Sequence, residues 1–322
     1  MHGRLFTLFD VTFPSYFVLL ATGFVLATAV GALWAKRLGH DPDVVVDLGI
    51  VMLIAGLVGA RVAHVLFDGF FWDYVHLCTD PSQVKWQITE AECLRHVEPD
   101  WLGCGRNGTL GLWDAQQQVC RPAEADCWSW AGISGGLTYY GGFIGASLVA
   151  FFRLRRDRFP FFRAADMAGF AIPLGLGFGR LGCVLGGCCF GAPLDAPWAI
   201  SFPAHSAASE KQAQLHLLAN PSLPSLPVHP SQLYESAAAF ALAAFLMLYL
   251  HPRKRYDGHV FLAFVASYAT IRFVLEFFRS DDRGGLVGLS TSQWIGVVLI
   301  SAAAFIHRRL TAKKPSVQAT AA

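Results

Sequence analysis

The stretch IPLGLGFGRLGCVLGGCCFG, residues 172–191, decides how this chain must fold. It is apolar enough to lie inside a lipid bilayer, yet Arg180 stands near its middle and seven of its twenty residues are glycine. A charge at the centre of a bilayer costs about 2.5 kcal/mol or more, so it marks a functional site by default. Glycines weaken a helix, but they let another backbone or a lipid headgroup come close. We therefore interpret the stretch as the floor of a polar pocket sunk in a membrane.

The composition around this stretch is that of an integral membrane protein. Of 322 residues, 54% are hydrophobic and 15% are charged, whereas a soluble domain carries about 25% charged residues. The net charge of +2 gives no indication of a nucleic-acid partner. Seven apolar stretches of roughly 20 residues are long enough to cross the hydrocarbon core. They are residues 16–35, 48–67, 133–152, 168–190, 233–250, 260–278 and 287–306.

The distribution of basic residues predicts the orientation of these spans. The loops after the first, third and fifth spans and the C-terminal tail hold 14 Lys and Arg, against 8 on the opposite side. Cytoplasmic loops carry the excess of Lys and Arg, so we expect the N-terminus outside and the C-terminus in the cytoplasm. The predicted fold is an all-α polytopic membrane protein with seven transmembrane helices. Its predicted segments are helices one and two (1–67), a cysteine-rich extracytoplasmic insertion (68–130), helices three and four (131–190), an extracytoplasmic loop (191–230), helices five to seven (231–307) and a cytoplasmic tail (308–322).

The insertion carries five of the eight cysteines, namely Cys78, Cys93, Cys104, Cys120 and Cys127. Cysteines on the oxidising side of a membrane are typically paired in disulfides. Because five is an odd number, at least one of them stays free or pairs elsewhere. The sequence leaves the connectivity open.

Four polar residues predict a charged face on the sixth span. Tyr268, Arg272, Glu276 and Arg279 follow one another at spacings of four, four and three, which places them on one side of a helix. Arginine is a planar fork that binds phosphate or carboxylate through two hydrogen bonds. A plain internal ion pair between Arg272 and Glu276 is the alternative. Arg180 in another span adds unmatched positive charge and favours a pocket that binds an anion.

Tyr140 and Arg61 each allow two interpretations. Tyr139 and Tyr140 stand between two glycine pairs near the expected outer surface. They belong either to an interfacial aromatic belt or to the pocket, where a phenol can bond a phosphate or pass a proton. Arg61, near the end of the second span, either snorkels to the outer interface or joins the pocket.

Cys183, Cys188 and Cys189 follow Arg180 closely. They could be ligands, nucleophiles or a redox pair. A free buried cysteine is usually a small hydrophobic residue, and adjacent cysteines have a poor geometry for a disulfide. The pattern therefore favours the apolar interpretation.

His229 and Glu235 flank Gln-Leu-Tyr at the start of the fifth span. A carboxylate in the first turn of a helix is ordinary capping, so the pattern favours a capping role for Glu235.

Five ordered motifs resemble those of the bacterial prolipoprotein diacylglyceryl transferase family. They are GGLTYYGGFIG (135–145), GRLG (179–182) followed by CFG (189–191), HPSQLYE (229–235), RFVLEFFR (272–279) and LSTSQW (289–294). The resemblance runs from about Tyr16 to Ile306, apart from the cysteine-rich insertion. It implies seven spans with the N-terminus outside, in agreement with the distribution of basic residues.

The resemblance also implies an activity and a set of site residues. Members of the family move the diacylglyceryl group of phosphatidylglycerol onto the lipobox cysteine thiol of a prolipoprotein, and glycerol phosphate leaves. The resemblance implies Arg180, Arg272 and Glu276 as catalytic residues, and Arg180, Tyr16, Tyr268, Arg279 and Gly191 as substrate-binding residues. From the residues themselves we add Tyr140 to the catalytic candidates, and His229 and Arg61 to the substrate-binding candidates. The implied partners are phosphatidylglycerol, lipobox peptides and membrane lipid, with no nucleic acid, metal or cofactor, in the bacterial inner membrane as a multi-pass protein.

Three positions depart from the family pattern. Tyr140 stands where the family has histidine, Cys183 where it has asparagine and Cys188 where it has glutamate. The family's histidine has a basic or substrate-orienting role, so we expect Glu276 or Tyr140 to take the proton of the acceptor thiol here.

Two other functions are compatible with the same residues. One is a non-catalytic phospholipid-binding or lipid-moving membrane protein on this fold, which needs the arginines but no thiol acceptor. The other is a membrane thiol-redox site, in which Cys188 and Cys189 exchange with the cysteine-rich loop.

Overall fold

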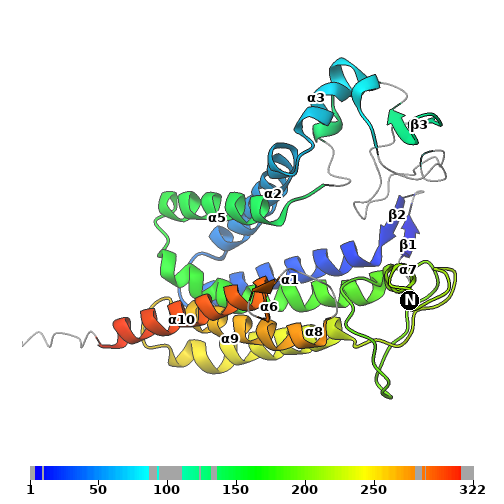
Figure 1. The fold of residues 1–322 in the computed structure, drawn as a ribbon. Coiled ribbons are helices and arrows are strands. Elements are labelled where there is room, and N and C mark those ends of the chain that lie inside the picture. Colours follow the sequence, from blue (N-terminus) through cyan, green and yellow to red (C-terminus); the bar gives the residue numbers. More distant parts are fainter. Residues whose placement is uncertain are drawn as a thin grey trace, which may run out of the picture. The chain divides into compact units, whose positions relative to one another are not determined.

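The computed structural model describes residues 4–8, 11–86, 93, 111–122, 125–131, 136–279, 285–286 and 288–312. The chain divides into two compact units (Figure 1). The first comprises residues 1–45 and 160–322, and the second comprises residues 46–159.

Helix α6 (Phe161–Gly186) is the centre of the first unit. It packs against α1 (Ser15–Arg37), α8 (Ser231–Ala244) and α9 (His259–Leu275), and α10 (Thr291–Ala312) packs against α9 (Figure 1). The glycines of α6 explain this close packing. A Cβ atom at Gly177 would lie 2.5 Å from the ring of Phe240 on α8, so this position admits no larger residue.

Two helices of this unit change geometry before they end. The helix that begins with α8 continues through a π-helical stretch, η3 (Phe245–Leu250), and a 3₁₀ turn, η4 (His251–Arg253). Likewise, α9 ends in a 3₁₀ turn, η5 (Glu276–Phe278). A short surface helix, α7 (Ala207–Gln214), lies in the predicted 191–230 loop. That loop has its own small apolar core of Phe202, Ala208 and Val228.

The beginning of α9 is fixed by a buried carboxylate on α6. Asp166 is fully buried and accepts hydrogen bonds from the backbone N–H groups of Gly258, Val260 and Phe261 at 2.8–3.2 Å. It also accepts one from Nζ of Lys254 at 2.9 Å. A helix N-terminus leaves such donors unpaired, and Asp166 satisfies three of them. Burial alone would lower the pKa of Lys254, but its hydrogen bonds to Asp257 and Asp166 outweigh that effect and raise it.

In the second unit, α2 (Pro42–Phe67), whose first residues belong to the other unit, packs closely against α5 (Tyr139–Arg156). A Cβ atom at Gly59 would lie 2.5 Å from the carbonyl oxygen of Gly141. Small residues that let two backbones approach are typical of helix contacts within membranes. The glycines of the GGLTYYGGFIG motif thus dock α5 onto α2. The unit also contains α3 (Phe71–Thr79), η1 (Pro81–Gln83) and η2 (Ser129–Ala131).

The predicted disulfides are present in this unit. Cys78 pairs with Cys127, and Cys93 pairs with Cys120. Cys104 lies outside the described residues. The side of the membrane on which this insertion lies stays a prediction.

The mainly helical prediction is confirmed, and the described residues add three short antiparallel hairpins to it. They are β1 (Arg4–Leu8) with β2 (Val11–Pro14), β3 (Gly111–Asp114) with β4 (Val119–Pro122), and β5 (Gly285–Leu286) with β6 (Leu289–Ser290).

Six helices in the described part of the chain are long and apolar enough to cross a membrane, where the sequence predicted seven. They are Ser15–Arg37, Pro42–Phe67, Phe161–Gly186, Ser231–Arg253, His259–Phe278 and Thr291–Ala312. The third predicted span corresponds to α5, which begins at Tyr139 rather than at Ile133. Its 18 residues include Arg153, Arg155 and Arg156 in the last turn, so it is less apolar than the others. A seventh crossing therefore stays a prediction.

Candidate active site

The centre of the candidate site is Glu235 on α8, a residue to which the sequence assigned only helix capping. That interpretation is wrong, because no acidic residue lies in the first turn of α8 and Glu235 is only 2% exposed. Its Oε1 accepts a hydrogen bond from the hydroxyl of Tyr268 at 2.8 Å. Its Oε2 lies 3.1 Å from Nη1 of Arg272 and 3.1 Å from Nε of Arg180. One carboxylate therefore joins the two arginines that the sequence singled out.

Three helices supply these side chains. Arg180 belongs to α6, Glu235 to α8, and Tyr268 and Arg272 to α9. The hydroxyl of Ser236 donates a hydrogen bond to the carbonyl oxygen of Gly177 at 2.9 Å. This contact holds α8 against α6 one helical turn before Arg180. The site is therefore built on rigid elements and not on loops, which keeps catalytic geometry precise.

The predicted charged face of α9 is confirmed in part. Nη2 of Arg272 lies 3.5 Å from Oε2 of Glu276, and the Glu276 side chain is 8% exposed. Arg279 follows η5, and its backbone N–H donates to the carbonyl of Glu276 at 3.2 Å. Arg272 thus contacts two carboxylates, one on its own helix and Glu235 on α8.

The orientation of Arg180 leaves part of its guanidinium available. Its Nε is buried and close to Glu235, but it has no hydrogen-bond partner among the described residues. The side chain is 21% exposed. Arg180 and Arg272 gather here with Glu235 and Glu276. Because the Arg180 side chain is partly exposed, an anionic ligand can still reach it.

Tyr16 and Gly191 lie at the edge of the same unit. A Cβ atom at Gly182 would be 3.0–3.2 Å from atoms of Tyr16, so the start of α1 lies directly on α6. Arg180 is within electrostatic reach of the Tyr16 hydroxyl. Gly191 donates its backbone N–H to the carbonyl of His229 at 3.0 Å, and a Cβ atom there would lie 2.5 Å from the carbonyl oxygen of Phe278.

His229 packs among aromatic rings. Its ring centroid lies 5.2 Å from that of Phe278, and its Nδ1 lies 3.5 Å from the hydroxyl of Tyr234. These contacts connect the start of α8 to the end of α9. Gly191 and His229 therefore join the segments around the arginines, and the described contacts support a positioning role for them.

The three cysteines near Arg180 form a cluster. Their Sγ atoms all lie within 4.8 Å of one another, and none of the three is in a disulfide.

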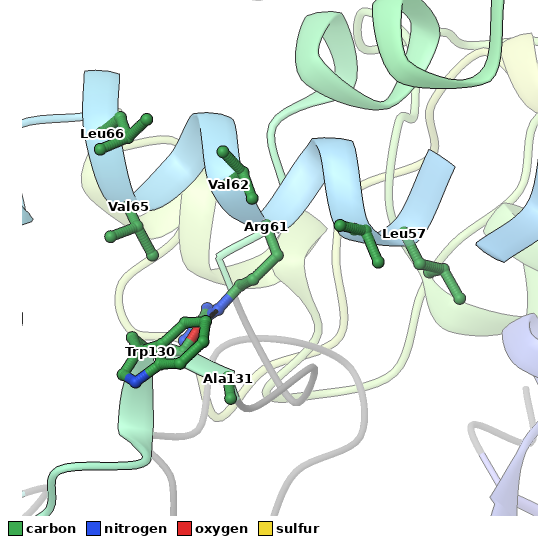
Figure 2. A pocket seen from close by; sticks show the side chains of 8 residues that line it. Leu57, Arg61, Val62, Val65, Leu66, Trp130 and Ala131 are labelled. Carbon is green, nitrogen blue, oxygen red and sulfur yellow. Dashed lines mark hydrogen bonds between the residues drawn. The ribbon is translucent and has the colours of Figure 1, made fainter. Parts of the chain in front are cut away.

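Arg61 and Tyr140 belong to the second unit, so their part in the pocket stays a prediction. Arg61 is 6% exposed, and it donates from Nε to the carbonyl of Trp130 at 2.7 Å and from Nη1 to that of Gly136 at 3.3 Å. Figure 2 shows its side chain extending toward Trp130, beside an apolar cavity of about 410 Å³. Arg61 is thus buried rather than snorkelling, and it fixes the segment that leads into α5. Tyr140 is 67% exposed at the start of that helix.

Sequence reasoning missed Glu235, although a signal was present. The segment SQLYESAAAFALAA is otherwise uncharged and mostly apolar. An ionisable residue inside such a segment marks a functional site by default. The capping interpretation prevailed because the start of α8 was placed two residues too late.

Comparison with known proteins agrees with this geometry. The family model described as prolipoprotein diacylglyceryl transferase matches residues 4–90 and 125–308. The residues between these ranges hold Cys93, Cys104 and Cys120, so the unmatched part is shorter than the 68–130 insertion that the sequence predicted.

Individual relatives carry the same name. A phosphatidylglycerol–prolipoprotein diacylglyceryl transferase of Clostridium tetani is 25% identical over 307 residues, which cover 95% of this chain and 96% of that protein. Those of Bordetella parapertussis and Bordetella bronchiseptica are 35% and 33% identical over 215 residues, 66% of this chain and 74% of each relative. These names favour a transferase over a non-catalytic lipid-binding protein. The chain belongs to the prolipoprotein diacylglyceryl transferase family.

Proposed function

We propose that this protein transfers the diacylglyceryl group of phosphatidylglycerol to the lipobox cysteine thiol of prolipoproteins and releases glycerol phosphate. Family membership supports the reaction, because the similar proteins are named for these two substrates. The observation that carries the assignment to particular residues is the pair Arg180 and Arg272, held by the single buried carboxylate of Glu235.

The two arginines bind the phosphate of the lipid. The side chains of Arg180 and Arg272 are held by Glu235 and are still 21% and 17% exposed. Arginine binds phosphate through two parallel hydrogen bonds. An anionic phospholipid entering from the bilayer would therefore complete the site.

The same pair stabilises the transition state. As the acceptor sulfur attacks C3 of the diacylglyceryl glycerol, the C3–O bond breaks and negative charge grows on the departing glycerol phosphate. Cations that are already in position, in a site that excludes most water, stabilise this developing charge strongly. The protein does not have to rearrange around the charge during the reaction. Removal of one group of this kind typically costs about 100- to 1,000-fold in rate.

The acceptor reacts as a thiolate, so its proton must go to a base. Glu276 has a single, longer arginine contact, to Arg272 at 3.5 Å, so it is less strongly held as a carboxylate than Glu235 and we assign the proton to it, with Tyr140 as the alternative. Glu235 is a poor base, because two guanidinium groups and the Tyr268 hydroxyl surround it. We assign to Glu235 and Tyr268 the positioning of the arginines.

We place the reaction at the outer face of the bacterial inner membrane. The excess of Lys and Arg on the opposite side supports an outer location for the end of α6. The disulfides Cys78–Cys127 and Cys93–Cys120 support an oxidising environment for the insertion.

The test uses purified protein, phosphatidylglycerol and a synthetic lipobox peptide, with mass spectrometry of the peptide as the readout. We expect a mass increase of one diacylglyceryl group. A peptide with serine in place of the lipobox cysteine should stay unmodified, as should the cysteine peptide when phosphatidylethanolamine is the only lipid. If the cysteine peptide is unchanged while labelled phosphatidylglycerol still binds, the transferase assignment is wrong.

A further inference from the structure

The thiols of Cys183, Cys188 and Cys189 gather at the end of α6. Their Sγ atoms lie within 4.8 Å of one another, although Cys183 is in the last turn of the helix and the other two follow it. Cys183 is buried and its two partners are half-buried. The sequence favoured three small hydrophobic residues, but converging sulfur atoms are more than apolar packing requires.

The backbone around these thiols is fixed by α8. The hydroxyl of Ser231 donates to the carbonyl of Cys189 at 2.9 Å, and Nε2 of Gln232 donates to that of Cys188 at 2.6 Å. Gln232 is 1% exposed, and its Oε1 has no hydrogen-bond partner among the described residues. Cys189 has a φ of 59°, a left-handed conformation that costs a non-glycine residue about 1–2 kcal/mol. The fold holds this strained turn in place and thereby keeps the three Sγ atoms close together.

This geometry suits a thiophilic cation. Three thiolates bound to one Zn²⁺ at about 2.3 Å in tetrahedral directions lie about 3.8 Å apart, and the three Sγ atoms here all lie within 4.8 Å of one another. We propose that Cys183, Cys188 and Cys189 bind a zinc-class divalent cation, and that the fourth position of this cation takes the acceptor thiol of the lipobox. The second part rests on the proposed function, because that function supplies the acceptor.

Among the described residues the cluster offers three ligands, the number of a catalytic site rather than of a structural one. Structural zinc sites are closed by four protein ligands, whereas catalytic sites have three and keep one position for water or substrate. A cation with three thiolates carries a net charge of −1, and Arg180 and Arg279 lie within electrostatic reach of Cys189. Positive charge nearby favours such an anionic centre.

The step balances in atoms and electrons. The lipobox thiol loses its proton to a base and binds the cation as a thiolate. Its sulfur then forms the new bond to C3, while the C3–O bond breaks and glycerol phosphate leaves with the bonding electrons. The product is a thioether, a weaker ligand than a thiolate, and it leaves the cation.

The first experiment measures metal binding without lipid or peptide. Full-length protein in detergent is treated with a thiol-free reductant and a chelator, and is then titrated with Co²⁺ as a spectroscopic substitute for Zn²⁺. We expect sulfur-to-cobalt charge-transfer absorption that saturates at one ion per chain and is lost when Zn²⁺ is added. Absence of this absorption in protein whose three thiols are reduced and accessible to a thiol reagent would overturn the site.

Variants then connect the signal to these residues. Cys188→Ser and Cys189→Ser should each weaken Co²⁺ binding by more than about 100-fold, since even the loss of an outer-shell partner costs 10- to 100-fold. His216→Ala removes an exposed histidine outside the cluster and should bind Co²⁺ as the wild type does. Equal binding by the Cys→Ser variants would place the metal elsewhere and contradict the proposal.

A final arm tests the open position and separates this inference from the transferase activity. Addition of a lipobox peptide to the Co²⁺ protein should change the absorption spectrum, and the serine peptide should not change it. An unchanged spectrum would overturn the acceptor role. Diacylglyceryl transfer by metal-free protein at the full rate would also overturn it, and would leave the proposed function intact. A spectral change without any transfer would instead keep the site and contradict the proposed function.

Discussion

Oε2 of Glu235 lies 3.1 Å from Nε of Arg180, which joins α8 to the middle helix of the first unit. The same oxygen lies 3.1 Å from Nη1 of Arg272 on α9. A buried carboxylate between two guanidinium groups fixes both of them before any ligand arrives. The phosphate of a lipid then meets a preset pair of cations.

Removal of the charge on Glu235 should damage both the fold and the reaction. Glu235→Gln leaves two buried arginines without their shared carboxylate, and loss of one partner of a buried ion pair typically costs about 3–5 kcal/mol. We expect a lower thermal unfolding temperature and at least about a 100-fold loss of transfer. Glu210→Gln, an exposed glutamate on α7, is the control. Wild-type turnover by Glu235→Gln would show that the arginines need no such anchor.

Arg272→Lys keeps the positive charge but loses the planar fork. Lysine is a point charge and cannot make two parallel hydrogen bonds to phosphate. We expect kcat to fall by about 100-fold with smaller effects on thermal stability, as measured by glycerol phosphate release. If the lysine variant retains full kcat, net charge alone explains the role of this residue.

Tyr268→Phe tests the positioning of the carboxylate. The hydroxyl donates to Oε1 of Glu235 at 2.8 Å, and a hydrogen bond to a charged group is worth about 1.5–3 kcal/mol. We expect kcat to fall by about tenfold or more, with little change in KM for the peptide. An unaltered kcat would mean that Arg180 and Arg272 alone hold Glu235.

Gly191→Ala should destabilise the contact between the 191–230 loop and the turn that ends α9. The added Cβ atom would lie 2.5 Å from the carbonyl oxygen of Phe278, and such overpacking costs about 1–3 kcal/mol. We expect a lower unfolding temperature together with lower activity. Gly186→Ala offers a contrast, because no atom lies within 4 Å of a Cβ there and its φ is not in the left-handed region. Equal stability of the two variants would contradict the packing argument.

Asp166→Ala should destabilise the first unit without a direct effect on chemistry. The carboxylate accepts from three backbone N–H groups at the start of α9 and from Lys254. Loss of a helix cap costs about 0.5–2 kcal/mol, and the lost contact with Lys254, which keeps its hydrogen bond to Asp257, adds to this. We expect a lower unfolding temperature but near-normal kcat for the folded fraction. Asp195→Ala, an exposed position, should unfold as the wild type does.

Six of the spans and the charged face of α9 could be predicted from the sequence, because they follow from hydrophobic length and helical spacing. The spacing of Arg272 and Glu276 is local, so their contact was predictable. The contact between Arg180 and Glu235 joins residues 55 positions apart on different helices, and no local pattern encodes it. The same holds for Arg61, whose partners are backbone carbonyls at residues 130 and 136.

The third predicted span shows that hydropathy alone can misplace the ends of a helix. Residues 133–152 read as one apolar stretch, but α5 begins at Tyr139 and runs on to Arg156. The glycine pairs of this region serve close contact with α2 rather than span length. The convergence of Cys183 with Cys188 and Cys189 was also hidden, because it depends on a left-handed turn at Cys189.

The most direct test of the central claim is the release of glycerol phosphate in parallel with thioether formation on the lipobox peptide. It compares the wild type with Arg180→Ala and with Arg163→Ala, an arginine at the other end of α6 that pairs with Asp257. We predict equal release and modification in the wild type and in Arg163→Ala, and at least about a 100-fold loss of both in Arg180→Ala. Undiminished release by Arg180→Ala would contradict the account.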